Sequence, residues 1–152
     1  MKYYLAAPVV TDDDTKAKVN AVYETLCDAK GAENVYRPGL HTVPNAWGIT
    51  MQMWGQCVFT MDVLAIDDCE WLVLCDFGRE KASAGTAWEC GYAFAKGKKV
   101  LIITMPGANE TSLMLNGCAA NVVTYETFIG GSFSMDNIFV ERGRLPSNQV
   151  LH

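Results

Sequence analysis

Trp71-Leu-Val-Leu-Cys75 and, after a short loop, Ser83-Ala-Gly-Thr-Ala-Trp-Glu-Cys-Gly-Tyr-Ala-Phe-Ala-Lys96 decide the fold. The first run is apolar without alternation, which predicts a parallel strand that is covered on both faces. The second predicts a helix that Ser83 caps and that ends near Gly97, and residues 98–104 form another apolar run. Strand, helix and strand make one βαβ unit. The first turns of this helix therefore lie at the carboxyl end of a parallel strand, where open α/β sheets bind ligands.

The remaining pattern extends this unit along the chain. Apolar runs predict further strands, and apolar positions at helical spacing predict helices between them. The strands are expected at 2–7, 33–37, 71–75, 98–104 and 120–124, the other helices at about 15–30, 49–66 and 112–117, and one more helix or strand at 136–142. This alternation predicts an α/β fold of three layers with about five parallel strands and right-handed crossovers. The sequence holds neither a GxGxxG nor a GxxxxGK[ST] motif, which excludes a recognisable dinucleotide fold or P-loop.

Composition limits the classes of function. The chain has 152 residues, half of them hydrophobic, which suits a single domain over 1–152. Its net charge is −5 and it has no Lys/Arg run, so no nucleic acid is expected as a partner. No apolar run approaches the ~20 residues that cross a bilayer, and the amino terminus leads straight into a strand, so neither a membrane span nor a signal peptide is expected.

The cysteines and histidines predict neither a metal site nor a bound cofactor. The six Cys residues form no CxxC pair and lie mostly in apolar or helical patterns. We interpret them as reduced, mostly buried thiols of a cytoplasmic protein. The two His residues, His41 and His152, have no metal-ligand spacing around them.

Two carboxylates are the candidates for catalysis. Glu89 falls in the second turn of the predicted helix, and Gly85, four residues earlier on the same face, leaves room for a ligand to approach. Asp62 shares a helix face with Val58 and Ile66, where a carboxylate is costly unless it is paired or used. The alternative interpretation is that both residues are ordinary acids on helix surfaces that face solvent. Used together, two carboxylates in one crevice suit glycosyl chemistry, in which one attacks the anomeric carbon and the other handles the proton of the leaving group.

Three hydroxyl groups are candidates for ligand contacts. Tyr4 precedes Ala6 at the carboxyl end of the first strand, where small residues leave space for a ligand. Ser83 and Ser112 stand at predicted helix starts, where backbone N–H groups converge on anions or ligand hydroxyls. Structural roles are the alternative for all three residues. A core Tyr is often hydrogen-bonded to the backbone, and a Ser at a helix start is often a simple N-cap.

The pattern resembles the nucleoside 2-deoxyribosyltransferase family over roughly residues 3–128. The most specific segment is Gly85-Thr-Ala-Trp-Glu-Cys-Gly-Tyr-Ala93. Weaker matches are Tyr3-Tyr-Leu-Ala-Ala-Pro8, Phe59-Thr-Met-Asp-Val-Leu-Ala-Ile66, Ser112-Leu-Met114 and Asn121-Val-Val123. The resemblance implies a flavodoxin-like fold with a five-stranded parallel sheet, and an oligomeric enzyme that acts on a nucleoside or nucleotide and a free nucleobase.

The resemblance also implies roles for single residues. Glu89 matches the nucleophile that attacks C1′ and forms a covalent 2-deoxyribosyl-enzyme, from which a second base takes the sugar. Asp62 matches a carboxylate that helps protonate the leaving base, and Tyr4 a tyrosine that holds the nucleophile. Met114 matches an apolar residue near the sugar. Ala6, Ser83, Gly85 and Ser112 complete the expected substrate-binding set.

Two departures leave an alternative open. Many transferases carry Asp where this chain has Ser83 and Asn where it has Ser112. Ser at both places resembles the related nucleoside 5′-monophosphate N-glycosidases, which hydrolyse the same bond and use such hydroxyls for the phosphate. The loop Ala6-Ala-Pro-Val-Val-Thr-Asp-Asp-Asp14 favours the transferase, because its acids would repel a phosphate by about 1 kcal/mol at ~4 Å even in water. A nucleotide-binding module without turnover is a third possibility, which the attacking carboxylate disfavours.

One segment predicts contact between subunits. Residues 47–61 carry more large apolar side chains than one helix face needs, namely Trp47, Met51, Met53, Trp54 and Met61. We expect part of this segment to pack against a second copy of the chain.

Overall fold

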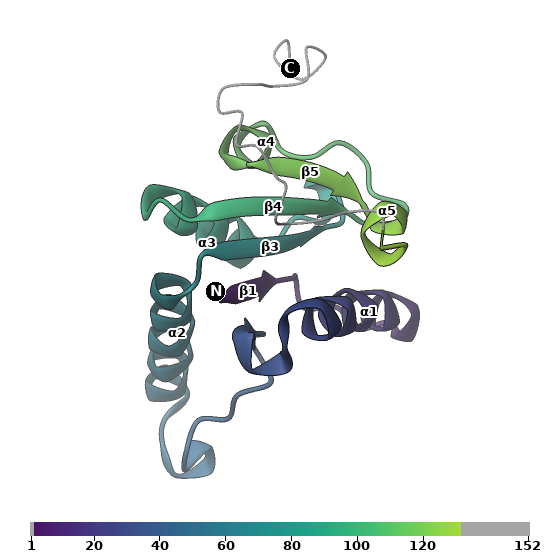
Figure 1. The fold of residues 1–152 in the computed structure, drawn as a ribbon. Coiled ribbons are helices and arrows are strands. Elements are labelled where there is room, and N and C mark those ends of the chain that lie inside the picture. The colour runs from purple at the N-terminus through teal and green to yellow at the C-terminus, as the bar shows by residue number, and fades with distance from the viewer. Residues whose placement is uncertain (1, 132–152) are drawn as a thin grey trace.

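The computed structural model describes residues 2–131, which form one twisted sheet with helices on both faces (Figure 1). In chain order the elements are β1 (Tyr3–Ala6), α1 (Asp13–Lys30), the 3-10 helix η1 (Ala32–Asn34), β2 (Val35–Tyr36), η2 (Ala46–Gly48), α2 (Met51–Asp68), β3 (Trp71–Asp76), η3 (Arg79–Lys81), α3 (Ala84–Ala95), β4 (Lys99–Thr104), α4 (Leu113–Cys118), β5 (Asn121–Thr124) and α5 (Tyr125–Ile129). The five predicted strands are all present. Four of them, β1, β2, β4 and β5, are shorter than expected, and β3 is one residue longer. The element expected at 136–142 lies outside the described residues.

The sheet has the order β2-β1-β3-β4-β5, and every neighbouring pair is parallel. In register, Tyr4 of β1 lies beside Leu72 of β3, which in turn lies beside Val100 of β4. This is the flavodoxin-like order, so the fold predicted from the sequence is confirmed. The direction of strand succession reverses between β1 and β3, and ligands of such sheets bind at the carboxyl end of that point.

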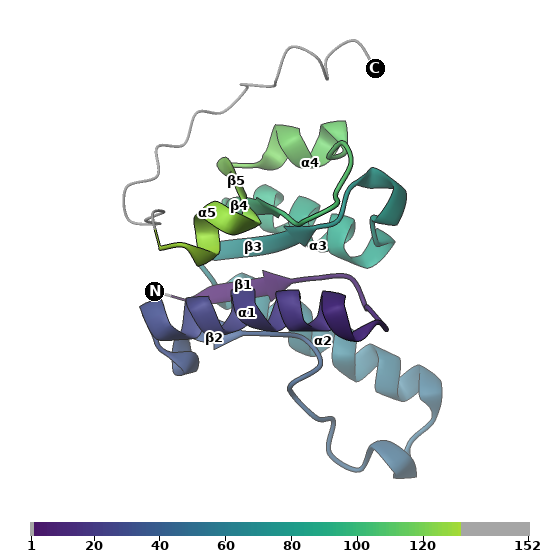
Figure 2. The same cartoon turned by 90° about the vertical axis from the view of Figure 1, so that its right-hand side faces the viewer.

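Alternation along the strands separates two cores. Side chains such as Tyr3, Leu5 and Val73 face α1 and α5, whereas Tyr4 and Leu72 face the layer made by α2, α3 and α4. Figure 2 shows α1 in front of β1 and α2 on the other side of the sheet. The side-chain period of two in a strand explains the division. It also places Tyr4 on the face that α2 and α3 cover.

Local capping explains where the helices begin and end. Asp12 Oδ2 accepts a hydrogen bond from Thr15 N at 2.8 Å, so α1 begins at residue 13, before the expected residue 15. Gly31 ends α1 at φ 89°, a left-handed conformation that glycine adopts without strain. The five-residue helix α5 was not predicted, because it is too short to show a helical period.

The cysteines correct one expectation. All six are free thiols, but only Cys69, Cys75 and Cys90 are buried. Cys57 on α2 is exposed, and Cys27 and Cys118 are partly buried, so half of the thiols and not most of them are buried. Among residues 2–131 no helix is both long and apolar enough to cross a membrane.

Candidate active site

Glu89 lies in the second turn of α3, where its carboxylate is largely buried. Its Oε2 and the hydroxyl of Tyr4 are buried atoms without a regular hydrogen-bond partner among residues 2–131. The two groups are nevertheless close enough to affect each other. Burial raises the pKa of Glu89 to about 7, the Tyr4 hydroxyl lowers it and the charge of Asp62 raises it further. The Tyr4 hydroxyl and the Glu89 carboxylate therefore interact, although the described residues show no regular hydrogen bond between Tyr4 Oη and Glu89 Oε2.

Tyr4 reaches Glu89 from the sheet. It is completely buried in the middle of β1, and its side chain faces α2 and α3. Burial, followed by the charges of Glu89 and Asp62, holds the pKa of Tyr4 far above its usual range. The phenol therefore stays protonated and offers Glu89 a hydrogen-bond donor at every working pH.

Asp62 approaches the same point from α2. Its Oδ1 accepts a hydrogen bond of 2.9 Å from the hydroxyl of Tyr36, which lies on the edge strand β2. Burial raises the pKa of Asp62, while the Tyr36 hydrogen bond and His41 lower it. The structure thus brings Tyr4, Asp62 and Glu89 together from three elements. Such a set of carboxylates with raised pKa values in a partly buried place is typical of a functional site.

A column of three stacked rings includes Tyr4 of this site. Tyr4 stacks on Tyr36, with ring centroids 5.4 Å apart, and Tyr36 stacks on His41 at 4.5 Å and an interplanar angle of 5°. The sequence pattern marks neither Tyr36 nor His41 as a site residue. A single Tyr in a two-residue strand and a His in a Pro/Gly loop carry no motif, so only the pairing of β1 with β2 reveals them.

Ser83 and Ser112 occupy helix starts, as predicted, but differ in what their hydroxyls do. Ser83 Oγ accepts from Thr86 N at 3.4 Å, a long capping bond. Ser112 precedes α4, and within the described residues its side chain makes no capping bond. Capping therefore accounts for the Ser83 hydroxyl but not for that of Ser112.

The other expected contact residues lie around these helix starts and at the end of β1. Gly85 is exposed one turn before Glu89, and Met114 is 79% exposed in the first turn of α4. Ala6 ends β1 and is buried against α3 and α4. Helices α3 and α4 pack against each other, so Gly85 and Met114 belong to adjacent elements.

Two loops at the carboxyl edge of the sheet are tied together by a buried carboxylate. Asp76, the last residue of β3, accepts hydrogen bonds from Gly78 N at 3.1 Å and from the hydroxyl of Thr111. Gly78 has φ 91°, and a Cβ there would lie 1.8 Å from Asn109 Oδ1. Arg79 N donates to the carbonyl of Glu110 at 2.8 Å. This link aligns the loops that lead to Ser83 and Ser112, and the sequence pattern did not reveal it.

Comparison with known proteins shows the family of the chain. A sequence model of the family described as nucleoside 2-deoxyribosyltransferase matches residues 3–147. The chain belongs to this family. Membership makes it an enzyme that acts on nucleosides. Among curated protein sequences, none matches the chain significantly.

Solved structures share the fold of this deoxyribosyltransferase-family chain. The 2-deoxyribosyltransferase of the psychrotolerant bacterium Bacillus psychrosaccharolyticus superposes with a TM-score of 0.75 at 21% identity, over 95% of this chain and 100% of that one. A conserved protein of Enterococcus faecalis V583 gives 0.63 at 19%, over 85% and 94%. The CMP N-glycosidase of Clostridium botulinum gives 0.57 at 18%, over 86% and 95%. At these identities the likeness shows the fold.

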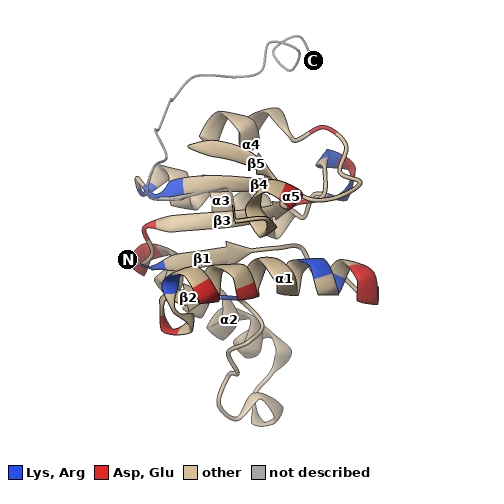
Figure 3. Cartoon of the chain, turned by 45° about the vertical axis from the view of Figure 1, so that its right-hand side comes forward, with Lys and Arg blue, Asp and Glu red and all other residues tan. Residues whose placement is uncertain are grey.

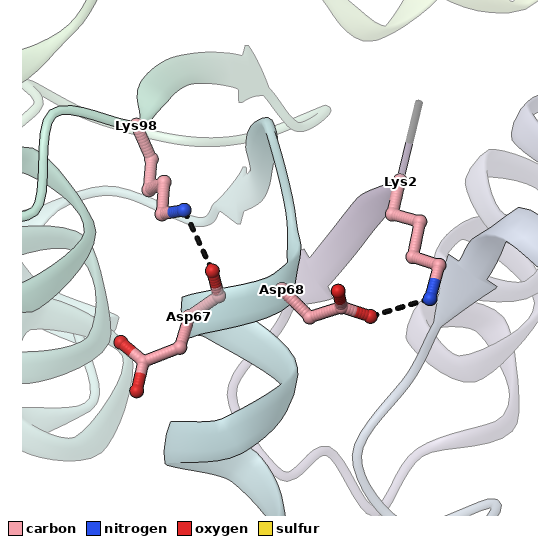
Figure 4. Close-up of polar contacts among 4 residues, drawn as sticks. All are labelled: Lys2, Asp67, Asp68 and Lys98. Carbon is pink, nitrogen blue, oxygen red and sulfur yellow. Dashed lines mark hydrogen bonds and ion pairs between the residues drawn. The ribbon is translucent and has the colours of Figure 1, made fainter.

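Asp67 and Asp68 end α2 outside this site, as expected of surface acids. Lys98 Nζ donates to the carbonyl of Asp67 at 2.7 Å, and Lys2 pairs with the carboxylate of Asp68 at 2.5 Å (Figure 4). Both pairs join α2 to the opposite, amino end of the sheet. Among residues 2–131 no group of three His, Cys, Asp or Glu side chains is placed to hold a metal ion.

The raised pKa of Glu89 predicts a pH-dependent stability. The ordinary value is 4.5 and the folded value about 7, so folding favours the protonated acid. The stabilisation is complete below pH 4.5 and is lost as the pH rises through about 7. Between pH 5 and pH 9 the wild type should therefore lose about 2–3 kcal/mol of unfolding free energy relative to Glu89→Gln. Urea unfolding of both proteins at the two pH values measures this, and parallel pH curves would contradict it.

Proposed function

We propose that this enzyme transfers 2-deoxyribose between nucleobases by double displacement through a covalent glycosyl-enzyme on Glu89. The observation that carries the proposal is the Glu89 carboxylate, buried beside the Tyr4 hydroxyl and within electrostatic reach of Asp62. A surface helix acid would have neither the burial nor a second carboxylate. Family membership supplies the substrate class, a nucleoside and a free nucleobase.

The first displacement forms the glycosyl-enzyme. An oxygen of ionised Glu89 attacks C1′ of the nucleoside, and the bond from C1′ to the ring nitrogen of the base breaks. The electron pair of that bond goes to the base, whose nitrogen takes a proton from Asp62. The transition state is positively charged at the sugar, so a carboxylate beside C1′ also stabilises it.

The second displacement reverses these steps with a different base. Its ring nitrogen loses a proton to Asp62 and attacks C1′, and Glu89 leaves as a carboxylate. Each displacement inverts C1′, so the configuration is retained overall. Tyr4, which stays neutral, holds the Glu89 carboxylate in line for attack and donates to it again when it leaves.

The remaining expected residues fit a sugar subsite on this side of the sheet. Ser112 offers a hydroxyl that makes no capping bond in the described part of the chain, and Met114 offers an exposed apolar side chain in the first turn of α4. Gly85 and Ser83 open α3 at the approach to Glu89, and Ala6 keeps the end of β1 small. We assign these five residues to substrate binding.

Hydrolysis of a nucleoside 5′-monophosphate is the second candidate. The uncapped hydroxyl of Ser112 favours it, because a hydroxyl at a helix start can bind phosphate oxygens. The acids after β1 oppose it. Asp12 already caps α1, and Asp14 pairs with Lys18 at 2.6 Å in its first turns, so carboxylates occupy the end of α1 that would attract an anion. We therefore place transfer between nucleosides first.

One assay separates these functions. The protein is incubated with a 2′-deoxynucleoside or its 5′-monophosphate, each with and without a different free base, and products are separated by chromatography. Transfer predicts a new deoxynucleoside that appears only with the second base. Free sugar alone, or faster cleavage of the monophosphate, would favour hydrolysis. No release of base from any substrate would contradict both.

We further propose that a second copy of the chain covers residues 38–61, which comprise the segment before α2 and the first turns of that helix. Residues 38–61 contain no charged side chain, and Figure 3 shows this segment without Lys, Arg, Asp or Glu, in contrast to α1. Both Trp47 and Met51 are almost fully exposed there. Two such surfaces can pack on each other without repulsion between like charges.

Replacement of Trp54 should test this contact. Trp54 is 44% exposed on α2, and Trp54→Lys would bring a charge into an apolar interface, which costs about 2 kcal/mol or more. We expect light scattering to show an oligomer for the wild type at micromolar concentration and a smaller species for the variant. Val9→Lys, at an exposed apolar site in the loop between β1 and α1, is the control. A monomeric wild type would contradict the proposal.

The free thiols support a location in the cytoplasm. None of the six cysteines is bonded to another, as expected of a protein kept in a reducing compartment. Cell fractionation that recovered the protein outside the cytoplasm would contradict this assignment.

A further inference from the structure

Tyr36 contacts two members of the candidate catalytic set, Asp62 and Tyr4. Its hydroxyl donates to Asp62 Oδ1 at 2.9 Å, while its ring lies between those of Tyr4 and His41. The residue belongs to β2, an edge strand of only two residues that pairs with β1. The stack on Tyr4 and His41 restricts how the ring can turn, so the direction of the hydroxyl toward Asp62 is set by packing.

We propose that Tyr36 is a positioning residue that binds Asp62 through Oδ1 and leaves Oδ2 as the oxygen that exchanges a proton with the nucleobase. This inference rests on the proposed function. A carboxylic acid that accepts a hydrogen bond at one oxygen keeps its proton on the other. The bond from Tyr36 therefore decides which oxygen of Asp62 is directed at the base.

The same bond favours the proton transfer. When the C1′–N bond breaks, the proton on Asp62 Oδ2 moves to the ring nitrogen and Asp62 becomes a carboxylate. The Tyr36 hydroxyl then donates to a charged acceptor, and such bonds are stronger than those to a neutral acid. Tyr36 keeps its own proton throughout, since burial and the bond to Asp62 raise its pKa well above the usual range.

Four groups face Asp62 and determine how it titrates. Tyr36 and His41 lower its pKa against the larger effect of burial, and Tyr4 and Glu89 interact with its charge from β1 and α3. Removing the Tyr36 hydroxyl takes away one of the two groups that favour the carboxylate. The pKa of Asp62 should then rise, which makes Asp62 a weaker acid.

Tyr36→Phe tests the inference, because Phe keeps the ring in the stack and removes only the hydroxyl. Tyr92→Phe is the matched control. Tyr92 Oη makes the same kind of bond, 2.8 Å to Asp67 Oδ1, on the exposed surface. We expect kcat for base exchange to fall about 10- to 100-fold in Tyr36→Phe with KM changed less than about threefold, and to stay near wild type in Tyr92→Phe.

Two measurements separate positioning from a general structural effect. Carbon-13 NMR of labelled aspartates, with Asp62 assigned by its loss in Asp62→Asn, should show that Asp62 titrates at higher pH in Tyr36→Phe. In a double-mutant cycle, Tyr36→Phe should lower kcat little further once Asp62 is Asn. An additive loss, or an Asp62 titration that matches the wild type, would overturn the inference. The titration requires no turnover, so it stands apart from the proposed function, which fails if the wild type cleaves no nucleoside.

Discussion

Glu89→Gln should lower kcat/KM for base exchange more than about 10³-fold, which corresponds to about 4 kcal/mol of transition-state stabilisation. The amide matches the carboxyl in shape but cannot attack C1′. It also removes the negative charge that stabilises the cationic sugar in the transition state. Steady-state exchange between a deoxynucleoside and a second base measures the loss.

A surface glutamate provides the control for this result, and detection of the covalent intermediate provides a second test. Glu24→Gln alters an exposed Glu of α1, on the other face of the sheet, and should exchange bases as the wild type does. Mass spectrometry of wild-type protein quenched with a deoxynucleoside should show the mass of one deoxyribosyl group on the peptide that holds Glu89. A label on another residue, or exchange retained by Glu89→Gln, would contradict the assignment.

Asp62→Asn is expected to lower kcat about 10²- to 10³-fold, because it removes the acid that protonates the leaving base. The loss should depend on the leaving group. A base that leaves readily as an anion needs little protonation, so the variant should lose least activity on nucleosides of the most acidic bases. Rates measured over a series of bases with different acidity give this dependence.

Asp68→Asn supplies the comparison on the same helix. Asp68 pairs with Lys2 on the surface, and such pairs contribute about 1 kcal/mol at most, so the variant should fold and exchange bases normally. An equal loss of activity for all bases in Asp62→Asn would mean that Asp62 binds substrate and does not transfer a proton.

Local patterns were sufficient to predict most of the fold. Strands such as Trp71–Asp76 are continuous apolar runs, and the helix that carries Glu89 has a cap and a glycine near its end. These signals arise from neighbours in the chain. The helix α5 was missed because five residues do not complete two turns, and the exposure of Cys57 was missed because helical spacing alone does not show which face is covered.

The candidate site was predicted only in part. Glu89, Asp62 and Tyr4 stand out in the sequence as carboxylates and a hydroxyl at particular places in predicted elements, and the structure brings them together. Tyr36 does not stand out, because its partner Asp62 is 26 residues away and no motif joins them. Their contact depends on the pairing of β2 with β1 and on the packing of α2 beneath the sheet.

By itself, the sequence determined the five strands, the longer helices between them and the helix turn that carries Glu89, since all of these follow from apolar patterns and capping between near neighbours. Only the tertiary structure decided the environment of the carboxylates. It buried Glu89 enough to raise its pKa to about 7, stacked Tyr36 between Tyr4 and His41, and joined Asp76 to Thr111 across two loops. The physical reason is that burial and long-range hydrogen bonds depend on how distant segments pack, which local propensities do not specify.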